Sequence, residues 1–272
     1  MASHPFRFGV ALLGTVGSAA DWQARVRHAA DLGYDIVHVA DHLPGIAPFP
    51  SLVAAASVPG PRLGTLALNT GLYRPAVLAR EVADTNTLIE GRLELGLGTG
   101  HSPADYEAAG LPLNRPGLRV DHVEQTITEL RRLVDPMPPL LVAASGRRML
   151  RLAAREADIV GFIVVTPDSE QFIADRIEFL HSAAGDRFDQ LELNLSVLSV
   201  IFTDGDPDLT MTRQLLPGQS DEQLRANPGV LIGSVSQVAE TLLRYQDKYR
   251  LTYFSVIEPY MKDFAKVIEQ LR

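Results

Sequence analysis

The sequence contains no cysteine, one tryptophan, and no apolar run near the roughly 20 residues that cross a bilayer. The absence of cysteine excludes disulfides, thiolate metal ligands and cysteine nucleophiles. Lys and Arg number 25 against 33 Asp and Glu, and they are scattered, so no surface is obviously built to neutralise a phosphate backbone. We therefore expect neither a nucleic-acid partner nor a membrane partner.

Apolar residues and length, by contrast, are present in quantity. The chain has 272 residues, of which 46% are hydrophobic, and α/β barrels of this size form one domain around a large core. We predict a single domain over residues 1–272. The N-terminal residues MASHPFRFGV lack the charged-then-apolar pattern of a signal peptide, so we expect a cytoplasmic protein.

Short apolar runs alternate with amphipathic helical stretches along the chain. Eight runs are predicted as strands, at residues 6–13, 36–40, 62–68, 92–97, 140–144, 159–165, 191–202 and 253–258. Helices are predicted at residues 20–32, 75–89, 117–134, 147–156, 169–184, 235–248 and 261–271. Residues 203–230, rich in Asp, Pro and Gly, are predicted as an irregular insertion with one or two short helices. The pattern indicates an α/β (β/α)8 TIM barrel, with a doubly wound sheet as the alternative.

The fourth predicted strand ends in the glycine-rich stretch GRLELGLGTGH, residues 91–101. Gly96, Gly98 and Gly100 lack a Cβ, so a planar ligand can lie against the main chain there; an ordinary tight turn is the alternative. A dinucleotide fingerprint does not fit, because His101 or Pro103 occupies the place of the third glycine. We expect no Rossmann NAD site.

The other strand ends carry few metal ligands, and functional groups of a barrel lie at these ends. Asp41 and His42 follow the second strand, but the first ends in Ala-Leu-Leu and the fifth in Ala-Ser-Gly, so no metal site is predicted. Ser145-Gly146-Arg147-Arg148 opens a helix, where free N–H groups, a hydroxyl and two cations favour a phosphate. A helix cap beside two solvated arginines is the alternative.

Together these segments carry a family resemblance. Residues 64–101, GTLALNTGLYRPAVLAREVADTNTLIEGRLELGLGTGH, resemble the bacterial luciferase-like oxidoreductases, in which a strand-three segment, a Pro-Ala-x-x-Ala helix and a G-R-x-x-L-G-x-G-x-G strand follow one another. Asp41-His42 and LVAASGRRMLRLAAREADIVG, residues 141–161, match as well. The resemblance covers most of the chain and is weakest over residues 203–228. Its general likeness is to the branch that uses the deazaflavin coenzyme F420 rather than FMN.

The resemblance implies a position for each part of the cofactor. The tricyclic ring would lie in the barrel mouth against a bulge of strand three at Leu66, Ala67 and Leu68, which in this family often holds a non-prolyl cis peptide bond. Other cofactor contacts are implied for Asn69, Thr99, Gly100, Ser145, Gly146, Arg147 and Thr166. Of these, Ser145, Gly146 and Thr166 would lie at the phosphate.

The resemblance also implies the catalytic residues. Asp41 and His42 would reach the ring and the substrate. His101 departs from the deazaflavin-dependent sugar-phosphate dehydrogenase, in which a glutamate proton donor stands at this place. Because an imidazole titrates near neutrality, either His42 or His101 can protonate the substrate as hydride passes from a reduced deazaflavin. By the period of two along a strand, His38 shares a face with His42 and is expected to be structural, while His4, His28, His122 and His181 are expected to be bystanders.

Two other functions stay open: an FMN-dependent monooxygenase of the same fold, and a non-catalytic flavin-binding relative. The substrate is expected to be a small molecule, or a peptide-like one, that is largely apolar or unsaturated. This follows from apolar and aromatic residues expected to face the pocket, namely Leu12, Leu13, Tyr73, Phe202 and Tyr260. The resemblance, not the residue pattern, implies a homodimer.

Overall fold

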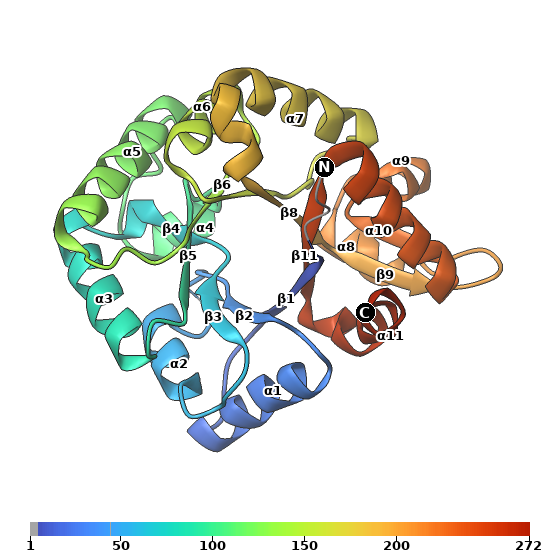
Figure 1. Ribbon diagram of the computed structural model, residues 1–272, viewed down its shortest axis with the longest axis horizontal. Coiled ribbons are helices and arrows are strands. Elements are labelled where there is room, and N and C mark those ends of the chain that lie inside the picture. Colours follow the sequence, from blue (N-terminus) through green and yellow to red (C-terminus); the bar gives the residue numbers. More distant parts are fainter. Residues whose placement is uncertain (1–4, 44) are drawn as a thin grey trace.

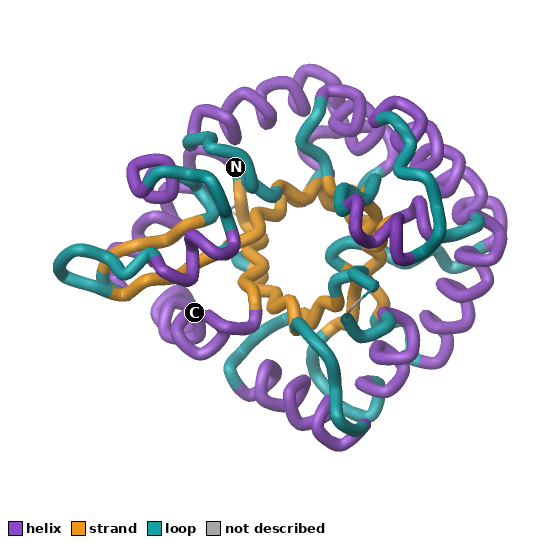
Figure 2. The backbone as a smooth tube through the Cα atoms, turned by 180° about the vertical axis from the view of Figure 1, so that it is seen from behind, coloured by secondary structure: helices purple, strands orange, loops and turns teal. Residues whose placement is uncertain are grey.

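A computed structural model describes residues 5–43 and 45–272 as a closed parallel barrel. Its strands are β1 (Arg7–Leu12), β2 (Ile36–Val39), β3 (Arg62–Thr65), β4 (Leu68–Asn69), β5 (Leu93–Gly98), β6 (Leu140–Ala143), β7 (Ile159–Phe162), β8 (Glu192–Val197) and β11 (Leu251–Ile257). Their order is β3-β2-β1-β11-β8-β7-β6-β5-β4, and pairing of β3 with β5 closes the ring that Figure 2 shows. The TIM barrel prediction is confirmed, and the doubly wound alternative is wrong.

Helices surround the barrel on its outer face (Figure 1). They are α1 (Ala19–Asp31), α2 (Pro48–Ala55), α3 (Pro75–Leu88), α5 (Pro116–Leu133), α6 (Arg147–Glu156), α7 (Glu170–Ala184), α10 (Val235–Tyr249) and α11 (Met261–Leu271). Between them and the strands lies the main core, whose largest fully buried side chains include Trp22, Phe8, Phe162, Phe254 and Phe264. Each such burial contributes roughly 1.5–3 kcal/mol.

Helix α2 was not predicted from the sequence. It has only eight residues, too few to show a helical period, and it begins with a proline at its first position, where the missing N–H costs nothing. Tertiary contacts hold it: the indole Nε1 of Trp22 in α1 donates to the carbonyl oxygen of Ser51 at 2.7 Å. A buried indole N–H needs such an acceptor, so α1 and α2 fix each other.

The prediction of one long strand over residues 191–202 was wrong. β8 ends at Val197, and β9 (Ser199–Phe202) leaves the barrel to pair with β10 (Val230–Gly233). Between β9 and β10 lie α8 (Thr210–Leu215) and α9 (Asp221–Ala226), the two short helices expected in the insertion. This outlying unit has a small core of its own, formed by Leu198, Leu209, Leu216, Leu224 and Val230. The insertion therefore begins at β9 and extends through β10.

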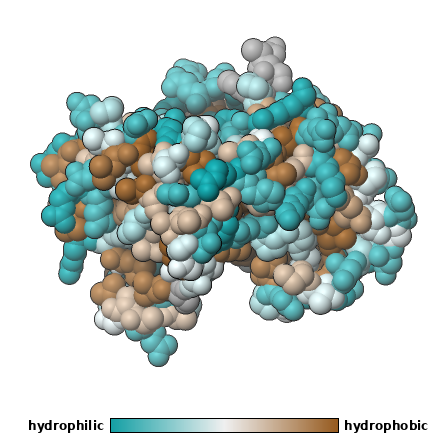
Figure 3. All heavy atoms as spheres, turned by 90° about the horizontal axis from the view of Figure 1, so that it is seen from below, coloured by the Kyte–Doolittle hydropathy of each residue, from teal (hydrophilic) through white to brown (hydrophobic). Residues whose placement is uncertain are grey.

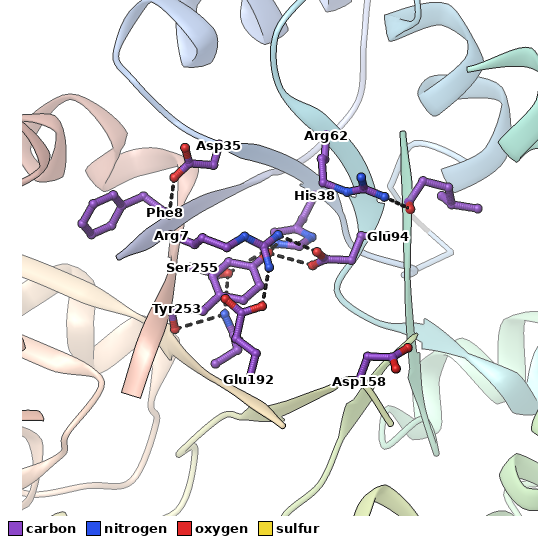
Figure 4. Close-up of polar contacts among 12 residues, drawn as sticks. Arg7, Phe8, Asp35, His38, Arg62, Glu94, Asp158, Glu192, Tyr253 and Ser255 are labelled. Carbon is purple, nitrogen blue, oxygen red and sulfur yellow. Dashed lines mark hydrogen bonds and ion pairs between the residues drawn. The ribbon is translucent and has the colours of Figure 1, made fainter. Parts of the chain in front are cut away.

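The floor of the barrel holds a buried polar cluster (Figure 4). Arg7 of β1 crosses the interior to the carboxylates of Glu94 in β5, at 2.6 Å, and of Glu192 in β8. The Tyr253 hydroxyl donates to Glu94 at 2.9 Å and lies 2.7 Å from His38 Nε2. Burial lowers the pKa of His38 to about 4. His38 is thus a neutral part of the floor, in agreement with its predicted structural role.

Strand three is interrupted where the family resemblance implied a bulge. β3 ends at Thr65, β4 resumes at Leu68, and the peptide bond between Leu66 and Ala67 is cis. Leu66 and Ala67 are half-buried, whereas the Leu68 side chain lies fully buried in the main core. Leu66 packs against the cluster of Ile36, Leu141, Ile159 and Tyr253. Of the three predicted ring-contacting residues, Leu68 thus has its side chain in the core and offers only its backbone.

Candidate active site

The mouth of the barrel is lined by small residues beside the interruption of strand three. A Cβ built on Gly98 would lie 3.6 Å from the Ala67 Cβ, 3.7 Å from the Leu68 carbonyl oxygen and 3.8 Å from the Ala143 Cβ. These are ordinary van der Waals distances, so a methyl group fits beside Gly98 without overlap. At this point β5 therefore presents bare backbone between Ala67 and Ala143.

The other two positions of the motif, Gly96 and Gly100, require glycine for a different reason. A Cβ on Gly96 would overlap the carbonyl oxygen of Thr65, and one on Gly100 would overlap the Asn69 side chain. Gly100 also has φ +65°, a conformation that favours glycine. Gly96 and Gly100 therefore permit close packing of the protein on itself, whereas a Cβ at Gly98 would fit without overlap.

Asp41 joins the end of β2 to β4. Its Oδ2 accepts a hydrogen bond from the Asn69 backbone N–H at 2.9 Å, and the Tyr73 hydroxyl also bonds to this carboxylate. Burial raises the pKa of Asp41 above its usual value although these hydrogen bonds, and the nearby His42, act in the opposite direction. Burial and the neighbouring Asp41 raise the pKa of Tyr73 as well. Asp41 thus forms the wall of the site and does not project into it.

His42 and His101 meet at the strand ends. Their ring centroids are 6.0 Å apart and the rings are perpendicular. His42 Nδ1 lies 2.8 Å from Oδ2 of Asp105, in the short helix α4 (Pro103–Ala108) that follows β5. The structure thus brings together the two predicted catalytic histidines from β2 and β5, and adds a carboxylate that the sequence analysis did not name.

Asn69 and Thr99 share one hydrogen-bond donor, the hydroxyl of Tyr106. The Tyr106 hydroxyl donates to Asn69 Oδ1 at 2.9 Å and to the Thr99 carbonyl oxygen at 3.3 Å, and burial raises the pKa of Tyr106. Arg119 donates to the carbonyl oxygen of Gly100. Asn69 is almost completely buried, and within the described residues its Nδ2 has no hydrogen-bond partner. A buried amide donor of this kind calls for an acceptor, such as a bound ligand.

The predicted phosphate corner lies at the start of α6. Gly146 caps this helix without a side-chain hydrogen bond, and residues 145–148 are exposed. The Ser145 carbonyl oxygen accepts from Arg176 at 2.8 Å, and the Arg147 guanidinium lies over the Phe179 ring of α7. The Thr166 hydroxyl bonds to Asp168. Backbone N–H groups at Gly146 and Arg147 are the donors that this corner presents.

Some predicted pocket residues lie elsewhere. Leu12 is buried in the main core, and Phe202 lies in β9, outside the barrel. Leu13 is exposed at the end of β1, and Tyr260 is half-buried against the core. The bystander histidines 28, 122 and 181 are on helices, with His122 bonded to the carbonyl oxygens of residues 70 and 73, and His4 lies outside the described residues.

The sequence analysis missed Asp105 and Tyr106, although one signal pointed to them. Ser102-Pro103-Ala104-Asp105 has the spacing of a helix-capping motif, and the Ser102 hydroxyl does accept from the Asp105 N–H at 3.2 Å. That motif predicts a helix start directly after His101. It does not predict that Asp105 faces His42, because His42 is far away in the chain.

Comparison with known proteins identifies the family. The family model described as "Luciferase-like monooxygenase" matches residues 2–226. The chain belongs to this family. The luciferase-like resemblance predicted from the sequence is therefore confirmed.

Several curated relatives of this luciferase-like chain have assigned names. An F420-dependent glucose-6-phosphate dehydrogenase from Intrasporangium calvum is 31% identical over 185 residues, 55% of this chain and 54% of that protein. One from Beutenbergia cavernae is 29% identical over 213 residues, 66% of this chain and 62% of that protein. A phthiodiolone/phenolphthiodiolone dimycocerosates ketoreductase from Mycobacterium sp. (strain JLS) is 30% identical over 149 residues, 46% of this chain and 38% of that protein. The matched region thus spans less than two thirds of each relative.

Solved structures show the same fold. An F420-dependent secondary alcohol dehydrogenase in complex with an F420-acetone adduct superposes with a TM-score of 0.79 at 13% identity, covering 99% of this chain and 100% of that one. The monooxygenase RslO1 from Streptomyces bottropensis gives 0.74 at 19% identity, covering 97% and 99%. At these identities the likeness extends to the fold alone. Within residues 5–43 and 45–272, none of the helices combines the length and apolar character of a membrane span.

Proposed function

We propose that this chain is a coenzyme F420-dependent oxidoreductase that transfers a hydride between the deazaflavin and an apolar alcohol or carbonyl substrate. The single observation that carries this proposal is the pair His42 and His101, whose ring centroids lie 6.0 Å apart at the barrel mouth. The names of the curated relatives and the F420-acetone adduct of a protein with the same fold support the choice of cofactor and reaction.

The residues present fit the cofactor. Gly98, between Ala67 and Ala143, presents no side chain, so a ring can lie against its backbone. Asn69 Nδ2 is a buried donor without a partner among the described residues, and a ring carbonyl would accept its hydrogen bond. At the other end, the uncapped N-terminus of α6 at Gly146 offers N–H groups to a phosphate. When bound, the coenzyme supplies a ring carbon that accepts or delivers hydride.

The chain's own residues would handle the proton. In the oxidising direction, a histidine takes the hydroxyl proton of the substrate as the carbinol hydride departs. In the reducing direction, the same ring returns the proton to the carbonyl oxygen. Asp41 and Tyr73 hold the β2 end against Asn69, which keeps His42 at the edge of the ring site.

The substrate class follows from the side chains exposed around the mouth. At the ends of β1, β2 and β7 they include the exposed apolar residues Leu13, Leu43, Ile163 and Val165. Apolar atoms are also exposed on the two lobes at the lower edge of Figure 3. Arg25, which reaches the end of β1, is paired with Glu258 at 2.5 Å. These features favour a neutral, largely apolar small molecule over a sugar phosphate.

Fluorescence titration tests the choice of cofactor. We expect micromolar protein to quench or shift the fluorescence of F420 and to bind FMN more weakly. No change with F420 at micromolar protein would contradict the proposal. Turnover is then measured anaerobically with reduced F420 and a panel of apolar ketones, with glucose 6-phosphate as the contrasting substrate.

An FMN-dependent monooxygenase is the second candidate, because the family model and the RslO1 structure are both named as monooxygenases. It predicts oxygen consumption when the protein is supplied with reduced FMN. Anaerobic turnover with reduced F420 alone would exclude it. A homodimer and a cytoplasmic location belong to our proposal as well, and light scattering in solution measures the first.

A further inference from the structure

The two histidines of the mouth differ in their partners. Asp105 Oδ2 lies 2.8 Å from His42 Nδ1, and the Asp105 side chain is almost fully buried. The same carboxylate accepts from the Leu43 backbone N–H and from the Ser102 side chain. His101 is exposed, and its ring lies perpendicular to that of His42 at a centroid distance of 6.0 Å. One carboxylate thus holds both the imidazole of His42 and the backbone beside it.

The charge of Asp105 decides where the proton on His42 sits. Burial acts to raise the pKa of Asp105, but the hydrogen bonds and charge of His42, with those from Leu43 and Ser102, outweigh it and hold the pKa below the usual value. An ionised carboxylate accepts hydrogen bonds and donates none. Nδ1 of His42 therefore carries a proton in either charge state of the ring, and when the ring is neutral the lone pair lies on Nε2.

His42 Nε2 is the nitrogen available to a substrate. Within residues 5–43 and 45–272 no hydrogen bond to it is formed, and the side chain is half exposed. The groups that face His42 are Asp41 before it, Asp105 from α4 and His101 after β5. Of the two carboxylates, Asp105 is the one that bonds to the ring.

We infer that Asp105 is a positioning residue that fixes His42 as the Nδ1–H tautomer, so that His42 Nε2, and not His101, exchanges the proton with the substrate. In alcohol oxidation the O–H bond would break with its proton passing to Nε2, the carbinol C–H bond would break, and the C=O double bond would form, with bound F420 as the two-electron acceptor of the hydride. The catalytic consequence depends on the proposed function. The tautomer does not.

Asp105→Asn is the informative variant, because asparagine keeps the size of the side chain while removing its charge. Its amide can turn its NH2 toward Nδ1 and stabilise the opposite tautomer. Glu107→Gln is the matched control, since Glu107 is an exposed acidic residue of the same helix. Asp105→Glu keeps the carboxylate and is expected to restore part of the activity. Circular dichroism of each variant checks that the fold is retained.

The first readout is the tautomer of His42 in the ligand-free protein, measured by long-range ¹H–¹⁵N NMR of the ring. We expect the Nδ1–H form in the native protein and in Glu107→Gln, and a mixture or the Nε2–H form in Asp105→Asn. An Nε2–H ring in the native protein, or an unchanged tautomer in Asp105→Asn, overturns the inference. This readout stands even if the protein shows no activity with F420.

The second readout is turnover with F420. We expect Asp105→Asn to lower kcat by roughly 10²–10⁴-fold, the usual contribution of a positioned acid–base group, with a much smaller change in KM. His42→Gln should lower kcat as far, and His101→Gln by less than tenfold. A larger loss in His101→Gln than in His42→Gln overturns the assignment. Absence of F420 binding in the native protein contradicts the proposed function and leaves the NMR result to decide the positioning role.

Discussion

The hydroxyl of Thr65 exchanges two hydrogen bonds with the backbone of Gly96: it donates to the Gly96 carbonyl oxygen at 2.9 Å and accepts from the Gly96 N–H at 2.9 Å. Thr65 is the last residue of β3, and the strand is interrupted directly after it. One side chain therefore replaces the ladder hydrogen bonds that the interruption removes. The absent Cβ of Gly96 lets the Thr65 backbone approach closely enough to do so.

Replacing Thr65 by Val should destabilise the fold. The shape is kept, but a buried N–H and a buried carbonyl oxygen of Gly96 lose their partner, at a cost of about 1–3 kcal/mol for each unsatisfied group. Thr65→Ser keeps the hydroxyl and should lose less than half as much. Chemical denaturation measures both, and equal losses in the two variants would contradict this account.

Replacing Gly98 or Gly96 by Ala should have different effects, on ligand binding in the first case and on stability in the second. Gly98→Ala meets only ordinary contacts, so we expect its stability to change by less than about 1 kcal/mol while F420 binding weakens at least tenfold. Gly96→Ala forces its Cβ into the Thr65 backbone and should lower the melting temperature strongly. Unaltered F420 affinity in Gly98→Ala would show that the ring lies elsewhere.

Asp41→Asn should change how stability depends on pH. The folded pKa of Asp41 is raised above its ordinary value of 3.8, so its stabilising contribution is present below that value and is lost as pH rises through the folded pKa. Asparagine does not titrate and can still accept from the Asn69 N–H. As pH rises from 4 to 7, the native protein should therefore lose unfolding free energy relative to the variant. Unfolding free energies at those two pH values test the sign.

Glu94→Ala should destabilise the protein by disrupting the polar cluster at the barrel floor. Removing this carboxylate leaves Arg7 and the Tyr253 hydroxyl short of a partner inside the barrel, and breaking a buried ion pair costs about 3–5 kcal/mol. Because Arg7 keeps its ion pair with Glu192, we expect a loss at the lower end of this range. Glu240→Ala, at an exposed acidic position of α10, should change stability by less than about 0.5 kcal/mol. Similar losses in the two variants would contradict a structural role for the cluster.

Leu224→Ala should open the outlying unit without unfolding the barrel. Leu224 is fully buried in the small core between β9 and β10, which is separate from the main core, and such a truncation costs about 2–5 kcal/mol. Hydrogen exchange is expected to speed up over residues 199–233 while β1 and β11 stay protected. Leu215→Ala, at an exposed leucine of α8, serves as the control. Uniform loss of protection would mean that the unit and the barrel unfold together.

The sequence by itself determined the alternation of strands and helices, because apolar periodicity is local. Helices 147–156 and 261–271 have the predicted bounds, and eight strand positions sufficed to predict a barrel. The order Asp41-His42, strand three and GLGTGH was likewise enough to indicate the luciferase-like family. Each of these features depends on residues that are close together in the chain.

Only the tertiary structure decided which groups meet. The chain cannot show that the apolar run at residues 191–202 breaks at Leu198, because the partner that draws β9 away is β10, about 30 residues later. Nor can it separate three similar glycines, since the neighbour of each, Thr65, Ala67 or Asn69, comes from a segment about 30 residues earlier in the chain. His42 acquires its carboxylate from α4, 63 positions away, because parallel strands bring β2 and β5 to one end of the barrel.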